Sequence, residues 1–289
     1  MTSTSVALCV YNGERFLSQQ LESLAAQTVL PDELVICDDA SSDGSMRIVE
    51  NFAKNAPFVV RIFKNTKNLG YIKNFEKAIG LCSMDIIFLC DQDDYWESEK
   101  LNKVLDVFDT EEEVGIVLHG FRKIDLNGAP YIEAEEKYGV NQLSANQLEE
   151  VFRSNSIEVF LLPYSRAWCG CMMAFRRKFN NLIIPIYPGK GHDDWILKII
   201  APLSEVRFLP DPLLRYRIHA WNNNSYEVGN KNFKYFLKRF FRRVNAILRG
   251  HSKRNFYRLL IARIEKSKIR LQHPELLDIY KNYIKFFRD

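Results

Sequence analysis

Short apolar runs alternate with amphipathic segments along the first 120 residues. The runs are rich in Val, Ile, Leu and Cys, which is typical of strands buried on both faces. The amphipathic segments repeat apolar positions every three or four residues, as helices packed on a sheet do. The predicted strands are Ser5–Tyr11, Glu33–Cys37, Phe58–Phe63, Asp85–Cys90 and Val114–His119. The predicted helices are Gly13–Gln27, Ser42 to about Asn55, Tyr71–Leu81 and Glu97–Phe108.

This alternation predicts an α/β fold with a Rossmann-like, mostly parallel sheet and helices on both faces. Ligands of such sheets bind beyond the carboxyl ends of the strands. Three polar segments follow three different predicted strands, namely Tyr11-Asn12, Asp38-Asp39 and Asp91-Gln92-Asp93. We therefore expect these segments to lie along one rim of the sheet.

The pattern weakens between about Asn127 and Trp168, where only one short helix is predicted, near Ala145–Arg153. Beyond this excursion the sequence predicts a strand at Gly170–Phe175, a helix at Trp195–Ile200, and two short strands at Val206–Leu209 and Leu213–Tyr216. From Asn232 onwards the pattern is helical. We expect one domain over residues 1–228 and a helical tail over residues 229–289.

The net charge of +4 is unevenly distributed. Residues 229–289 carry 17 Lys and Arg against 4 Asp and Glu, a net +13, so residues 1–228 carry a net −9. Within Asn232–Arg249, Lys and Arg alternate with apolar residues at helical spacing, which predicts a basic amphipathic helix. Such a helix can bind an anionic membrane surface or pack its apolar face on the domain, and the sequence leaves both open. No nucleic-acid partner is expected, because no recognised motif accompanies the charge.

The cellular compartment is predicted from the apolar runs, the first residues and the cysteines of the chain. No apolar run reaches the length of a membrane-spanning helix, and the first residues lack the basic and apolar regions of a signal peptide. Four of the six cysteines lie in or beside apolar runs, where a free thiol behaves as a small hydrophobe. We expect a cytoplasmic protein, attached peripherally to the inner face of the plasma membrane if the tail binds lipid.

Three carboxylates follow the strand at Asp85–Cys90 within four residues. Asp91 and Asp93 could hold a divalent cation together, or could serve as ordinary acids before a helix; Asp94 is expected to stabilise the N-terminus of that helix. Asp38-Asp39 follows the second strand, and a carboxylate there could accept a hydrogen bond from the imide N–H of a pyrimidine base. Tyr11 could stack on the base. The alternatives are an ordinary acidic turn for Asp38-Asp39 and simple packing for Tyr11.

Together these segments resemble the family 2 glycosyltransferases, which have a GT-A fold. The resemblance is carried by VALCVYNGERFLSQQLESLAAQTVLPDELVICDDASSDGS, NLGYIKNFEKAI and CDQDDYWESEKL, and more loosely by GCMMAF, HDDW and LLRYRIHAWNN. It implies a nucleotide-sugar-binding half at residues 1–120 and an acceptor and catalytic half at residues 121–228.

The resemblance implies that the protein transfers a sugar, with inversion, from a nucleotide-diphosphate sugar to a hydroxyl of a lipid-linked or cell-surface polysaccharide precursor. DQDDYW and HDDW are similar to segments of bacterial transferases that build O-antigen, capsule or rhamnose-containing polysaccharides, which favours a UDP- or dTDP-sugar donor. The alternative is a non-catalytic protein of the same fold that binds nucleotide sugars or glycans.

The resemblance also implies roles for individual residues. The nucleotide would be bound by Cys9, Tyr11, Asp39, Lys73 and Asp91. Asp93 of the DxD motif would hold Mg²⁺ or Mn²⁺ with His219 as a further ligand, and Asp91 and Arg217 would contact the diphosphate.

The catalytic base implied by the resemblance is Asp193. Asp194 is the alternative base, because this chain has His192-Asp193 where the family usually has Glu-Asp. Arg215 and Arg217 lie two residues apart on a predicted strand, and only one of them is expected to face the site.

Overall fold

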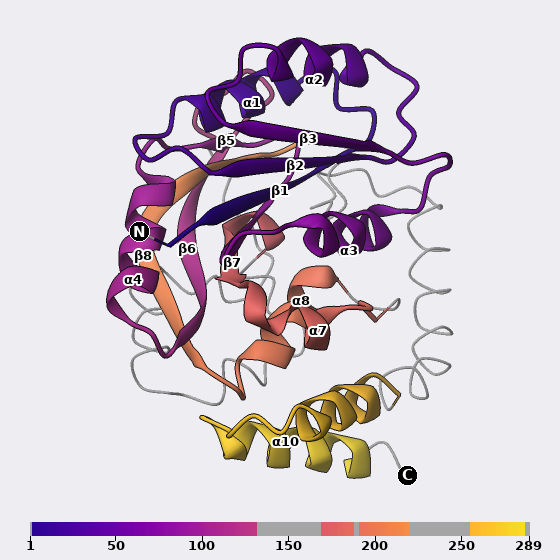
Figure 1. The fold of residues 1–289 in the computed structure, drawn as a ribbon, viewed down its shortest axis with the longest axis vertical. Coiled ribbons are helices and arrows are strands. Elements are labelled where there is room, and N and C mark those ends of the chain that lie inside the picture. Colours follow the sequence, from indigo (N-terminus) through magenta and orange to yellow (C-terminus); the bar gives the residue numbers. More distant parts are fainter. Residues whose placement is uncertain (1, 132–168, 188–190, 220–254, 287–289) are drawn as a thin grey trace.

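The computed structural model describes residues 2–131, 169–187, 191–219 and 255–286 (Figure 1). The helices predicted at Ala145–Arg153 and Asn232–Arg249 lie outside these ranges. The elements in chain order are β1 (Thr4–Val10), α1 (Leu17–Ala25), β2 (Glu33–Asp38), α2 (Ser45–Ala53), β3 (Val59–Lys64), α3 (Tyr71–Leu81), β4 (Ile86–Cys90), β5 (Tyr95–Trp96), α4 (Lys100–Thr110), β6 (Val114–Ile124), η1 (Gly170–Met172), β7 (Met173–Arg176), η2 (Arg177–Phe179), α7 (Asn180–Ile183), α8 (His192–Ile200), β8 (Glu205–Arg217) and α10 (Pro274–Phe286). Residues 255–266 form a further helix.

The described strands form one eight-stranded sheet in the order β3-β2-β1-β4-β7-β6-β8-β5. Strands β1 to β4 are parallel to one another, and β6 is parallel to β8. Strand β7 runs antiparallel between β4 and β6, and β5 runs antiparallel to β8 at the edge. The mostly parallel sheet predicted from the sequence is confirmed, with two reversed strands that the pattern did not reveal.

Alternate residues of each central strand point to opposite faces of the sheet. On one face, Leu8 of β1 packs with apolar residues of α1, α2 and α4. On the other face, Ala7 of β1 packs with apolar residues of α3, α7 and α8. Both faces are therefore covered by helices, as predicted, and the strands are buried on both sides (Figure 1).

Strand β8 corrects the sequence interpretation, because it is one continuous strand where two short ones were predicted. The interruption that the sequence suggested is a register shift against β6 near Gly120, opposite Pro210 and Pro212. A Cβ at Gly120 would lie 2.8 Å from the Pro210 carbonyl oxygen, so glycine allows the two backbones to approach here.

Smaller corrections concern the ends of elements. The predicted strand at Gly170–Phe175 begins as the 3₁₀ turn η1, and β6 continues to Ile124. The first helix begins at Leu17 instead of Gly13, and the two-residue strand β5 was not predicted. A strand this short has too few residues for an alternating pattern.

The C-terminal helices pack on the domain beyond α8 (Figure 1). Phe256, Leu260 and Tyr280 are fully buried and belong to the same apolar core as Trp195 of α8. The packed cover is therefore present for residues 255–286. The division between domain and tail at residue 228 stays a prediction. Among the described residues, no helix has the length and apolar character needed to cross a bilayer.

Candidate active site

The carboxyl ends of β1, β2 and β4 meet at one edge of the sheet. The Asp39 N–H donates to the Val10 carbonyl oxygen at 2.7 Å, which joins the ends of β2 and β1. The Gln92 side chain joins β4 to β1, because its Oε1 accepts from the Tyr11 N–H at 2.8 Å and its Nε2 donates to the Tyr11 carbonyl at 3.0 Å. The predicted rim of polar segments is confirmed.

Asp39 is buried at this rim and holds the loop before α3. Its Oδ1 accepts hydrogen bonds from the Leu69 N–H and from Asn65 Nδ2, both at 2.8 Å. Its Oδ2 accepts one from the Gly70 N–H at 2.9 Å. Gly70 has φ +81°, a conformation that glycine adopts without strain. Since Oδ2 takes part in one hydrogen bond, it retains a lone pair for another donor.

Asp91 and Asp93 follow β4, and the charge of Asp93 affects the pKa of Asp91. Burial raises the pKa of Asp91 to about 7, and the negative charge of Asp93 contributes to the same direction. Asp93 Oδ2 lies 2.8 Å from His219 Nε2. The His219 ring stacks on Phe16 with a centroid distance of 5.4 Å, so the end of β8 reaches the DxD turn.

Helix α8 brings two further carboxylates from the second half of the chain. Asp193 Oδ1 accepts from the Asp194 N–H at 2.8 Å in the first turn. Burial raises the pKa of Tyr71, and the nearby charge of Asp193 raises it further. The same charge contributes to the raised pKa of Asp91. The Tyr71 ring meets the neighbouring His192 edge-on at 6.0 Å, so the first turn of α8 lies beside the loop that Asp39 holds. Asp194 instead forms an ion pair with Lys198, one turn along α8.

His192, which stands where the family usually has Glu, is a packed side chain. Its ring stacks on Phe75 with centroids 4.0 Å apart and meets the Tyr71 ring edge-on. Burial lowers the pKa of His192, which keeps the imidazole neutral. A Cβ at Gly170 would lie 2.4 Å from His192 Nε2, so the glycine of η1 makes room for this ring.

Residues 5–183 match the family model described as glycosyl transferase family 2. The chain belongs to glycosyl transferase family 2. A curated family relative, dTDP-rhamnosyl transferase RfbG of Shigella flexneri, is 32% identical over 247 residues, which cover 80% of this chain and 77% of the relative. The chain spans only 59–66% of the length of the first curated relatives that it matches.

Solved structures of low sequence identity share the fold. S. aureus TarS in complex with UDP-GlcNAc has a TM-score of 0.61 and 19% identity, over 97% of this chain and 72% of TarS. The mannosyltransferase PcManGT from Pyrobaculum calidifontis, in complex with GDP-Man and Mn²⁺, has a TM-score of 0.59 and 15% identity, over 99% of this chain and 70% of that one. The predicted GT-A fold is confirmed.

Asp94 differs from its sequence interpretation. It does not stabilise a helix, because α4 begins six residues later, at Lys100, with no acidic residue in its first turn. The Asp94 side chain is instead fully buried, and its Oδ1 accepts from the Arg217 N–H at 3.1 Å. In this family 2 chain, the third carboxylate of the turn therefore points into the protein.

Arg217 is buried and Arg215 is exposed, so one of the two arginines near the end of β8 faces inward, as expected. Their spacing does not explain this, because residues two apart on a strand share a face. The Arg217 guanidinium packs over the Phe16 ring at 4.6 Å. It donates to four protein oxygens, which are the carbonyls of Asp93, Asp125 and Leu126 and Gln19 Oε1. Contact with the diphosphate stays a prediction, and the bonds that the structure gives Arg217 fix the backbone of the DxD turn.

Lys73 and Cys9, two other predicted nucleotide-binding residues, lie at the rim and contact other protein side chains. Lys73, in the first turn of α3, forms an ion pair with Glu76 at 2.7 Å. Cys9 of β1 is half-buried and packs against the core on the α3 face. Burial raises the pKa of its thiol, with Cys37 and Asp91 adding to the shift. The nucleotide-binding roles of both residues remain predictions.

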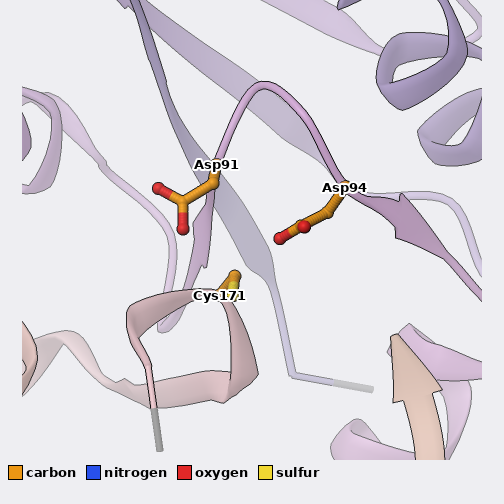
Figure 2. A group of neighbouring side chains, drawn as sticks. All are labelled: Asp91, Asp94 and Cys171. Atoms are coloured by element: carbon orange, nitrogen blue, oxygen red, sulfur yellow. The ribbon is translucent and has the colours of Figure 1, made fainter. Parts of the chain in front are cut away.

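Cys171 is a residue that sequence reasoning missed. Figure 2 shows its side chain in η1 facing Asp91 and Asp94 across the turn that follows β4. The ligand atoms of these three residues all lie within 4.8 Å of one another. No sequence signal indicated this, because Cys171 is 77 residues beyond Asp94 and belongs to no metal-binding spacing.

Gln92 and Tyr71 were also missed. Gln92 is the middle residue of the DxD motif, and its bonds to Tyr11 depend on strand order, which hydrophobic pattern does not reveal. Tyr71 leaves 44% of its surface exposed beside Asp193, and Tyr11 leaves 48% exposed. The one signal that could have indicated Tyr71 is its position as an aromatic residue directly after the predicted turn Asn68-Leu69-Gly70.

Proposed function

We propose that this family 2 chain is an inverting glycosyltransferase. It moves a sugar from a UDP- or dTDP-sugar to a hydroxyl of a lipid-linked or cell-surface polysaccharide precursor. The observation that carries this proposal is the convergence of Asp39, the DxD turn and Asp193 at the carboxyl edge of a GT-A sheet. The name of the dTDP-rhamnosyl transferase relative and the UDP-GlcNAc bound to TarS support the donor class.

The nucleotide would occupy the rim beside β1 and β2. The exposed ring of Tyr11 offers a stacking surface for the base. The remaining lone pair on Asp39 Oδ2 suits the imide N–H that uracil and thymine share. Cys9 and Lys73 border this position, and Asp91 would contact the ribose or the diphosphate.

A divalent cation fits the carboxylates of the DxD turn. Burial and the repulsion between Asp91 and Asp93 hold the pKa of Asp91 near 7, and a positive ion would relieve both. Asp91 and Asp93 would hold Mg²⁺ or Mn²⁺, with His219 as a neighbouring ligand. The cation would supply Lewis-acid stabilisation of the departing diphosphate. The Mn²⁺ bound by the mannosyltransferase of the same fold supports this assignment.

Asp193 would act as the base. Its carboxylate accepts the proton of the acceptor hydroxyl while that oxygen forms a bond to the anomeric carbon. The bond from this carbon to the diphosphate breaks, and the nucleoside diphosphate leaves from the opposite face. A single displacement of this kind inverts the anomeric configuration. Asp194 remains the alternative base, but its carboxylate is already engaged in an ion pair with Lys198.

Peripheral binding to an anionic membrane surface is a further part of the proposal. It would depend on the basic segment Asn232–Arg249, because residues 255–286 already pack on α8. Co-sedimentation with phosphatidylserine vesicles tests it. Binding that disappears when Lys and Arg within Asn232–Arg249 are replaced by Gln is expected, and unchanged binding would contradict it.

The experiment for the function is turnover of a panel of UDP-, dTDP- and GDP-sugars, with and without Mn²⁺ and with a lipid-linked acceptor. We expect cation-dependent release of the nucleoside diphosphate from at least one UDP- or dTDP-sugar, and loss of this release in Asp93→Ala. If saturable binding occurs but no donor in the panel is turned over, the chain is a binding protein of the same fold.

A further inference from the structure

A second set of possible metal ligands, which includes one thiol, lies at the DxD turn and shares Asp91 with the set expected for Mg²⁺ or Mn²⁺. It consists of Asp91, Asp94 and Cys171, whose carboxylates and thiol lie within 4.8 Å of one another (Figure 2). Asp94 and Cys171 are completely buried. The three residues come from two segments, the turn after β4 and η1, so the tertiary fold holds them together.

Asp94 gives an independent indication that something is bound between these side chains. Its Oδ1 accepts from the Arg217 N–H, whereas its Oδ2 is buried without a hydrogen bond of normal geometry among the described residues, and the Cys171 thiol, a weak donor, lies beside the carboxyl. A buried oxygen without a partner costs about 1–3 kcal/mol, and more if it is charged. Folded proteins avoid this cost unless a water, ion or ligand completes the site.

The buried Lys100 ammonium does not complete this site. It donates to the Cys171 carbonyl oxygen at 2.7 Å and lies 3.5 Å above the centre of the Trp96 ring. It thus binds the backbone and the ring, and no hydrogen bond from it to either carboxylate is present among the described residues.

We propose that Asp91, Asp94 and Cys171 form a binding site for a thiophilic divalent cation, with Zn²⁺ as the best match. A thiolate with two carboxylates suits Zn²⁺, whereas Mg²⁺ and Mn²⁺ prefer oxygen ligands alone. On binding, the Cys171 thiol loses its proton to solvent and forms a metal–sulfur bond, and both carboxylates bind as anions. A water molecule would complete a four-coordinate shell.

The site has a consequence for the reaction, and this part rests on the proposed function. Asp91 belongs to both sets of ligands, so an ion on Cys171 removes one carboxylate from the donor site. Zn²⁺ would therefore inhibit the Mn²⁺-dependent reaction. Replacement of Cys171 by serine would make the enzyme less sensitive to Zn²⁺.

The test uses Co²⁺ as a spectroscopic substitute for Zn²⁺ with the reduced full-length chain. Thiolate bound to Co²⁺ gives a charge-transfer absorption band in the near ultraviolet, which oxygen ligands do not give. We expect a saturable band in the wild type that Zn²⁺ abolishes and Mg²⁺ does not. The band should be absent in Cys171→Ser, and Asp94→Asn should raise the Kd at least about tenfold.

The matched control is Cys82→Ser, because Cys82 is a buried free thiol at the end of α3, outside this set of ligands. It should keep the wild-type band. Cys169→Ser tests the second thiol, whose sulfur lies 3.0 Å from that of Cys171, and should also keep a band. Circular dichroism without metal shows that each variant is folded, and Cys171→Ala replaces Cys171→Ser if the latter does not fold.

A band of full intensity in the folded Cys171 variant, or no band in the folded wild type, would overturn the proposal. This result is independent of the enzyme assay. A cobalt band without turnover of any donor would count against the proposed function alone. Full Mn²⁺-dependent turnover without a cobalt band would count against the thiophilic site alone.

Discussion

Single side chains connect the strands at the amino ends of the sheet, opposite the candidate site. Glu33, at the start of β2, is buried and accepts hydrogen bonds from Ser5 Oγ at 2.6 Å and from the Ser83 N–H at 2.6 Å. Arg61 on β3 donates to its other oxygen at 2.9 Å. Burial alone would raise the pKa of Glu33, but these bonds to the charged form outweigh it and lower the pKa from 4.5.

A pH-dependent stability follows from Glu33. Because its pKa is lower in the folded chain, the unfolded chain binds more protons below pH 4.5. Its contribution is complete above that pH and is lost as the pH falls through the folded value. We expect Glu33→Gln to lower the free energy of unfolding at pH 7 by about 1.5–3 kcal/mol. The free energy of unfolding should also decrease less in acid for this variant than for the wild type. Urea unfolding at pH 7 and below 4.5 measures both, and parallel pH profiles would contradict the assignment.

At the scale of elements, β8 determines the shape of the DxD turn. Its last residues bring Arg217 to the Asp93 carbonyl and His219 to the Asp93 carboxylate. The turn is thus fixed by a strand more than 120 residues away in sequence, and cation binding should depend on that strand.

Replacement of the two arginines of β8 tests this dependence. Arg217→Met should lower the free energy of unfolding by at least about 1.5–3 kcal/mol, because it leaves buried oxygens without a donor. It should also weaken Mn²⁺ binding, measured by calorimetry. Arg215→Met is the matched control, because Arg215 is exposed and forms its ion pair with Glu97 at the surface. Arg215→Met should lower the free energy of unfolding by less than about 1 kcal/mol. Equal effects of the two variants would show that β8 does not fix the turn.

At the scale of the whole molecule, the C-terminal helices support the helix that carries Asp193. The Tyr280 hydroxyl donates to the Lys198 carbonyl oxygen, and the Arg263 guanidinium lies over the Trp195 ring at 5.2 Å while it donates to the Leu182 carbonyl. Residues 255–286 are therefore part of the same apolar core as α8, so their removal should expose apolar surface of that helix.

Neighbouring leucines of the helix at residues 255–266 test this packing. Leu260 is fully buried, and Leu260→Ala should lower the free energy of unfolding by about 2–5 kcal/mol. Leu259 is 39% exposed, and Leu259→Ala should change the free energy of unfolding by less than about 0.5 kcal/mol. Urea denaturation of both variants is the measurement. If Leu260→Ala were as stable as the wild type, the helix would not be part of the core.

Much of the fold could be predicted because local pattern and tertiary role agree in β1 to α4. Each strand there is a continuous apolar run, and each helix has a clear apolar face. The rim followed from one rule about parallel sheets, which placed Tyr11, Asp39 and Asp91 together.

The remaining features depend on contacts between distant segments. The insertion of β7 between β4 and β6, the burial of Asp94 and the approach of Cys171 leave no local pattern. The same holds for Arg217, because no local pattern shows that it is buried while Arg215 is exposed, or which groups it contacts.

The central claim is that this rim is a catalytic site with Asp193 as its base. The most direct measurement is the rate of nucleoside diphosphate release, at saturating donor and Mn²⁺, for Asp193→Asn beside Asp194→Asn. We predict that Asp193→Asn lowers kcat by about 10²- to 10⁴-fold, with donor affinity unchanged, and that Asp194→Asn loses less than about tenfold. A near-normal rate in Asp193→Asn, or a larger loss in Asp194→Asn, would contradict the account.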